Sequence, residues 1–102
     1  MKQLKALKCR CCGLDKTDPR LRAKLIGLQS LRSQPLAVTS GTRCAKHNAR
    51  VGGAPCSLHL QGKAVDVAVK AGAQGLLCRQ ARAAGFRVIL PDPQKGYVHL
   101  SL

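Results

Sequence analysis

Apolar residues recur along the chain with two spacings, and these spacings predict where the helices and strands lie. A stripe of leucines at helical spacing follows Thr17 and Asp18, either of which can cap a helix, and Pro19, which suits a first turn. We therefore predict a helix that starts at Pro19 and ends at residues 34–35. The buried stripe of this helix is expected to comprise Leu21, Leu25 and Leu28.

Shorter apolar runs, separated by Gly and Pro, predict the remaining elements. Gly85 is placed to close the last helix. A chain of 102 residues is near the small end of what buries an adequate core, so we expect one domain over residues 1–102. The order of elements indicates an α+β fold, with helices packed on a mainly antiparallel sheet. Strands are expected over 36–39, 64–69, 86–90 and 97–102, and further helices over 43–50 and 74–84.

The strand expected over residues 64–69 carries one acidic side chain among valines. Because side chains alternate along a strand, the valines share one face and Asp66 points to the other. If the strand that carries His99 is its neighbour, Asp66 and His99 converge, and His59 lies above them in a glycine-flanked segment. Two histidines and a carboxylate form a ligand set of catalytic zinc, which keeps a fourth position open for water. The sequence thus predicts a zinc site at the sheet, formed by His59, Asp66 and His99.

These residues belong to a longer motif, Ser57-x-His59-x-x-Gly62-x-Ala64-x-Asp66, which Tyr97-x-His99 follows. The motif resembles that of the zinc D-Ala-D-Ala carboxypeptidase-type metallopeptidases, the peptidase M15 family, which includes phage endolysins. The stretches 40–43 (Ser-Gly-Thr-Arg) and 47–48 (His-Asn) match the same pattern. The resemblance implies a zinc-dependent hydrolase that cuts peptide bonds of peptidoglycan, as a carboxypeptidase or an endopeptidase.

The resemblance also implies roles for residues around the zinc. Arg43 would bind the substrate's carboxylate or its scissile carbonyl, and Ser57 would hydrogen-bond substrate, although capping its own loop is the alternative for Ser57. Many members carry an acidic general base three residues before the last zinc ligand, but this position is Gly96 here. The nearest carboxylate along the chain, Asp92, is the candidate for the base. Without a base, the chain would be a catalytically silent zinc-containing module that binds the cell wall.

Charge narrows the choice of partners. The formal net charge of +14 draws the protein towards polyanions, and only Phe86 and Tyr97 are available to stack on bases. We therefore expect anionic cell-envelope polymers rather than specific nucleic acid as a partner, and a monomeric protein. No apolar run is long enough to span a membrane, and residues 1–8 lack the apolar core of a secretory signal. We expect synthesis in the cytoplasm and delivery to the bacterial wall by a phage lysis system or a virion.

Six cysteines in so short a chain leave three alternatives open. They can be small buried side chains, one of the cluster 9–12 can form a disulfide with Cys44, or some can bind a second metal ion. The cluster holds only three cysteines and is too tight to supply four zinc ligands alone, whereas Cys44, Cys56 and Cys78 occur singly.

Overall fold

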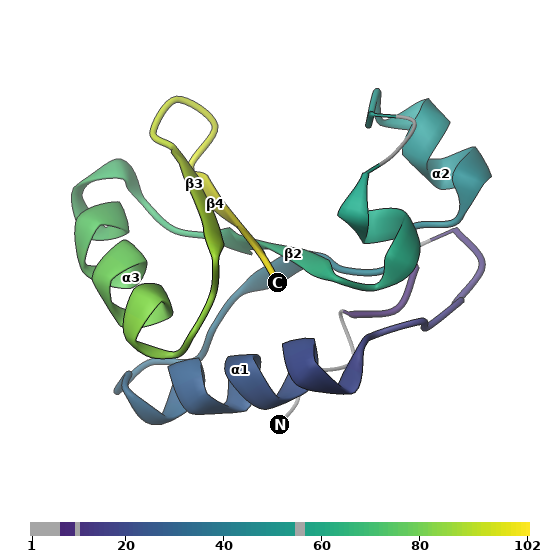
Figure 1. Ribbon diagram of the computed structural model, residues 1–102. Coiled ribbons are helices and arrows are strands. Elements are labelled where there is room, and N and C mark those ends of the chain that lie inside the picture. Colours follow the sequence, from purple (N-terminus) through teal and green to yellow (C-terminus); the bar gives the residue numbers. More distant parts are fainter. Residues whose placement is uncertain (1–6, 10, 55–56) are drawn as a thin grey trace.

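The computed structural model, which describes residues 7–9, 11–54 and 57–102, combines helices with one antiparallel sheet (Figure 1). The α+β fold predicted from the pattern of elements is confirmed. The described helices are α1 (Pro19–Ser30), α2 (Ala45–Arg50), α3 (Ala71–Ala83) and a 3₁₀ turn, η2 (Leu58–Gln61). The described strands are β1 (Val38–Ser40), β2 (Ala64–Ala68), β3 (Val88–Asp92) and β4 (Tyr97–Ser101).

The sheet has the strand order β1-β2-β4-β3, so β2 and β4 are its central strands. Every neighbouring pair is antiparallel. Leucines of α1 and α3 pack with valines of β2 and β4 in one core cluster, and both helices therefore cover the same face of the sheet (Figure 1). Asp66 and His99 alternate with the core residues of their strands and thus lie on the opposite face.

Helix α1 forms as its sequence signals predict. The Asp18 carboxylate caps it by accepting a hydrogen bond from the Arg20 N–H, and the three leucines of its stripe are buried. Hydrogen bonds from the side chain and backbone of Arg20 lower the pKa of the Asp18 carboxyl to about 2. The helix ends at Ser30 rather than near Pro35, so Arg32 lies beyond its end.

Two other boundaries differ from the prediction for physical reasons. Helix α3 starts at Ala71 rather than Gln74, so it includes Gly72 in its first turn. A glycine within a helix costs only about 1 kcal/mol, and the burial of Leu77 and Ala81 offsets this cost. Strand β3 runs to Asp92 and includes Pro91, whereas the expected strand ended at residue 90. Because β3 is an edge strand, a proline can occupy it without removing a hydrogen bond from the interior of the sheet.

Gly62 connects the first helix to the segment that carries His59. It follows η2 with a φ of +69°, and its carbonyl accepts a hydrogen bond of 2.9 Å from the Asp18 N–H. A Cβ atom at this position would collide with the Lys16 carbonyl oxygen. Glycine is therefore required here both by the left-handed backbone and by the close approach of the chain.

The apolar runs of the sequence led to two predictions, that no segment spans a membrane and that residues 1–8 are not a secretory signal. Among the described residues, every helix is too short or too polar to cross a membrane. Residues 1–6, which carry most of the segment judged not to be a secretory signal, lie outside the described part of the chain.

We predict that Gly62→Ala destabilises the protein and that Gly27→Ala does not. The left-handed conformation alone costs a non-glycine residue about 1–2 kcal/mol, and the collision with Lys16 adds to this cost. Gly27 lies within α1 with open space around it, so alanine there should raise the free energy of unfolding by about 0.5–1 kcal/mol. Urea unfolding of the two variants measures both effects, and equal stabilities would contradict the prediction.

Candidate functional site

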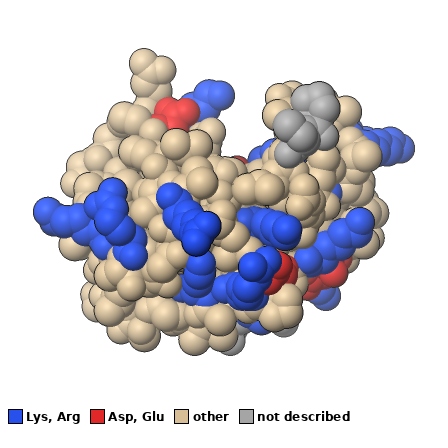
Figure 2. Space-filling view, in the orientation of Figure 1, with Lys and Arg blue, Asp and Glu red and all other residues tan. Residues whose placement is uncertain are grey.

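One pocket of about 330 Å³ opens on the face of the sheet that α1 and α3 leave uncovered. Figure 2 shows a notch on the surface between the β3–β4 turn and the region of α2. The structure brings together around this pocket all of the site residues that the sequence suggested. They are Arg43, Ser57, His59, Asp66, Asp92 and His99.

The centre of the pocket is formed by His59, Asp66 and His99. Asp66 on β2 lies directly opposite His99 on β4 in the antiparallel register, and His99 Nδ1 is 3.0 Å from Asp66 Oδ1. His59 Nε2 approaches the same oxygen at 3.4 Å from η2. The two imidazole rings meet edge to face, with centroids 5.2 Å apart. One ligand atom from each residue lies within 4.8 Å of the other two.

His59 is held in one orientation by the backbone around it. The residue is buried, and its Nδ1 lies 2.8 Å from the carbonyl oxygen of Gly41, to which it donates as an N–H. In the neutral form of the imidazole, which carries one proton, this hydrogen bond places the proton on Nδ1 and leaves the lone pair of Nε2 available to a metal ion. The Ser57 hydroxyl accepts a hydrogen bond from the His59 N–H and so caps η2. The glycine-flanked segment in which the sequence placed His59 therefore contains a 3₁₀ turn that the sequence did not predict.

The Asp66 carboxylate remains ionised to low pH. Partial burial raises its pKa, but hydrogen bonds from His59 and His99, and the positive charges of these residues when they are protonated, outweigh this effect and hold the pKa well below its usual range. The side chain is only 14% exposed, whereas that of His99 is 23% exposed. The cluster is thus accessible to solvent mainly from the side of β4.

Arg43 approaches the same carboxylate from the segment after β1. Its Nη2 is 3.2 Å from Asp66 Oδ2, while Nε donates to the Ser40 hydroxyl and Nη1 to the Asn48 side-chain oxygen. These contacts fix the guanidinium from three sides. Because it carries five N–H donors, it can bind a substrate oxygen in addition to the three protein groups.

Asp92 is the second carboxylate of the pocket. The chain has four acidic residues, all aspartates, of which Asp15 bonds to Thr17 and Asp18 caps α1. Asp66 and Asp92 are the two that line the pocket. The Asp92 carboxylate also accepts a hydrogen bond from the Lys95 N–H, which ties it to the turn between β3 and β4.

Several residues that shape the site were missed by sequence reasoning. Leu90, Pro91 and Tyr97 also line the pocket, and the pairing of β3 with β4 sets Leu90 directly opposite His99. Tyr97 is part of the motif quoted above. For Leu90 and Pro91, no sequence pattern indicates a place in the pocket until the pairing of the strands is known. Asn48, which belongs to the matched stretch 47–48, braces its loop by donating to the Ala54 carbonyl.

The three central side chains fit a zinc ion. Zinc binds imidazole nitrogen and carboxylate oxygen at about 2.0–2.2 Å, so tetrahedral geometry separates its ligand atoms by about 3.4 Å. The two separations from Asp66 Oδ1, 3.4 and 3.0 Å, are close to this value. The hydrogen bond from His59 to Gly41 is also the kind of contact that orients a metal-binding histidine.

Comparison with known proteins agrees with the motif and the fold. No curated protein matches the sequence significantly. The family model described as Peptidase M15 matches residues 3–101, nearly the whole chain. The resemblance drawn from the motif is thereby confirmed, and the protein belongs to the peptidase M15 family.

Proposed function

We propose that the protein is a zinc-dependent peptidase that hydrolyses peptide bonds of peptidoglycan, in the manner of an endolysin. The observation that carries this proposal is the convergence of His59, Asp66 and His99 at the base of an open pocket. Membership of a peptidase family supports peptide hydrolysis, and the positive charge of the chain suits an anionic wall. A bond that involves D-Ala, cut as a carboxypeptidase or an endopeptidase, is the substrate we favour.

In this proposal, His59, Asp66 and His99 hold the metal. When bound, zinc supplies a positive charge that polarises the scissile carbonyl and lowers the pKa of a water molecule to about 7. The Asp66 carboxylate offsets part of that charge, since both imidazoles are neutral when they bind a metal. His59 is kept in the required tautomer by its hydrogen bond to Gly41.

The remaining pocket residues act on the substrate. Asp92, the second carboxylate of the pocket, accepts the proton of the attacking water and later returns it to the leaving amine. Arg43 donates to the oxygen on which negative charge develops, or to the terminal carboxylate of the substrate. The Ser57 hydroxyl accepts from the backbone of η2, and its own proton is free to be donated to the substrate.

A second function is favoured by one specific feature. Gly96 stands where many relatives carry the acidic base, and a chain of net charge +14 would bind an anionic wall without catalysis. In that alternative, the zinc site stabilises the fold of a cell-wall-binding module. Delivery by a phage or its lysis system is part of either proposal.

We predict that peptidase activity depends on zinc and on His59. Purified peptidoglycan is incubated with wild-type protein, chelator-treated protein and His59→Ala, and the release of new amino groups and of free D-Ala is measured. Both treatments should reduce release at least ~100-fold, because the water is then no longer activated. His47→Ala is the matched control, since His47 lies on α2 outside the pocket lining, and it should keep most of the activity. If folded, zinc-loaded wild-type protein releases nothing from several wall types, the binding-module alternative is favoured.

We predict that Asp92→Asn lowers kcat about 10²–10⁴-fold, because the amide cannot accept the proton of the water. Zinc affinity should not change, since Asp92 is outside the cluster of ligand atoms. Asp15→Asn is the control, because Asp15 contacts Thr17 and Arg22 elsewhere on the surface. A wild-type kcat in Asp92→Asn would remove Asp92 from the mechanism.

We predict that Arg43→Ala lowers kcat by roughly 10²–10³-fold, the effect expected when one donor to a developing oxyanion is removed. Arg50→Ala, which removes an exposed arginine from the end of α2, should leave kcat unchanged. Zinc content is measured for both variants because Arg43 contacts Asp66. Loss of activity that merely follows loss of zinc would assign Arg43 to the support of the metal site.

A further inference from the structure

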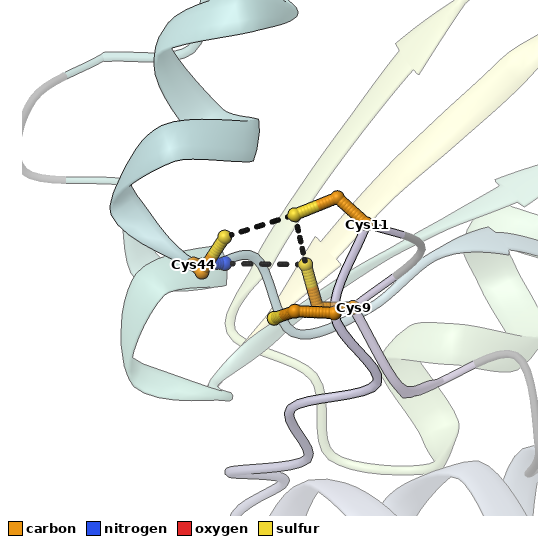
Figure 3. Close-up of side chains that lie close together, drawn as sticks. Cys9, Cys11 and Cys44 are labelled. Carbon is orange, nitrogen blue, oxygen red and sulfur yellow. Dashed lines mark hydrogen bonds between the residues drawn. The ribbon is translucent and has the colours of Figure 1, made fainter.

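Four cysteine sulfurs converge at a second point of the molecule, outside the pocket. Cys9, Cys11 and Cys12 come from a loop near the N-terminus, and Cys44 immediately precedes α2. Figure 3 shows Cys9, Cys11 and Cys44. All four sulfur atoms lie within 4.8 Å of one another. Cys11 Sγ is 3.8 Å from Cys9 Sγ and 3.2 Å from Cys44 Sγ. A tetrahedral zinc site with bonds of about 2.3 Å to sulfur separates its ligands by about 3.8 Å, so the cluster needs only small adjustments to hold the ion.

Two backbone hydrogen bonds hold the segment that carries Cys9, Cys11 and Cys12, the cysteine loop, in a tight turn. The Cys9 N–H donates to the Leu14 carbonyl at 2.7 Å, and the Gly13 N–H donates to the Cys9 carbonyl at 2.8 Å. Gly13 has a φ of +75°, which allows the chain to reverse within these few residues. The loop thus brings three thiols beside a fourth that is more than thirty positions away in sequence.

Backbone N–H groups also point at two of the sulfurs. The Cys44 N–H donates to Cys9 Sγ at 3.4 Å, and the His47 N–H donates to Cys44 Sγ at the same distance. Hydrogen bonds of this kind favour the thiolate over the thiol, and thiolates are the form that binds metal. Four thiolates around Zn²⁺ leave a charge of −2, which a chain of net charge +14 accommodates readily.

The two alternatives to metal binding fit the cluster less well. Cys11 and Cys12 are exposed, so they are not small apolar side chains of the core. Cys78 does have that role, since it packs against the core cluster. A disulfide would bond two sulfurs at about 2.05 Å and would use only two of the four, whereas Cys11 Sγ has two sulfur neighbours at 3.8 and 3.2 Å. Cys56 lies outside the described residues.

We propose that Cys9, Cys11, Cys12 and Cys44 bind a second, structural zinc ion. Four protein ligands fill a tetrahedral shell, so this site has no open position for water and serves the fold rather than catalysis.

The ion would act by fixing the segment that orients the pocket residues. The loop before Cys44 contains Gly41, whose carbonyl orients His59, and Arg43, which contacts Asp66. This loop is already tied to the N-terminal segment, because the Thr42 N–H donates to the Leu7 carbonyl at 2.7 Å. A zinc ion between Cys44 and the cysteine loop would fasten the two segments at a second point.

The proposal is tested by metal content in variants that separate the two sites. The protein is purified under reducing conditions with zinc, and its metal content is measured by inductively coupled plasma mass spectrometry. The wild type should contain two zinc ions per chain. Cys44→Ser and His59→Ala should each contain one. Cys78→Ser is the matched control and should keep two, because Cys78 lies in α3 away from the cluster.

A spectroscopic measurement keeps the test decisive if Cys44→Ser does not fold. The zinc retained by His59→Ala should show four sulfur neighbours at about 2.3 Å in X-ray absorption, and cobalt in its place should show thiolate charge-transfer bands. One zinc in the wild type and none in His59→Ala would overturn the proposal. The proposal would also be overturned if the mass of the protein were lower by two hydrogen atoms and peptide mapping located a disulfide bond between Cys44 and the cysteine loop. Both results are independent of peptidase activity, so the proposed function can fail without affecting this test.

Discussion

The register of β2 on β4 is the constraint on which the candidate site depends. It sets Asp66 and His99 opposite each other on the open face of the sheet, with their side chains 3.0 Å apart. The neighbouring pairs, Val65 with Leu100 and Val67 with Val98, are buried on the other face. A slip of one residue would exchange the two faces of a strand, so core burial and site geometry enforce the same pairing. The hydrophobic core thereby fixes the position of the polar site.

The rest of the site is added to this pair by loops that hold one another in place. The Arg43 N–H donates to the His59 carbonyl at 3.0 Å, and the Gly41 carbonyl accepts from the imidazole of the same residue. Gly62 then joins the end of η2 to the start of α1. Because loops pay more conformational entropy than they gain from apolar burial, such cross-links are needed to hold catalytic side chains still. The proposed zinc at the cysteine cluster would belong to this same set of cross-links.

Charge is distributed so that the pocket differs from the rest of the surface. Lys and Arg side chains are spread over the face shown in Figure 2, with few acidic ones among them. Two of the chain's four carboxylates, Asp66 and Asp92, lie in the pocket, and Asp66 is surrounded by Arg43 and two histidines. The proposed metal site thus relies on a carboxylate in a strongly positive protein, since the attraction between a carboxylate and a cation is strong at short distance.

The sequence by itself determined the α+β fold class, the leucine stripe of α1 and the face of β2 on which Asp66 lies, because local periodicity encodes these features. It also determined the family, because a long motif encodes it. It placed strand and helix ends within a few residues, and missed the proline in β3 because edge position is a property of the sheet. It also left the cysteines undecided. Only the tertiary structure brought Cys44 to the cysteine loop, Gly41 to His59 and Leu90 beside His99. These contacts join residues distant in sequence, and no local pattern records which distant segments the packing of the core brings together.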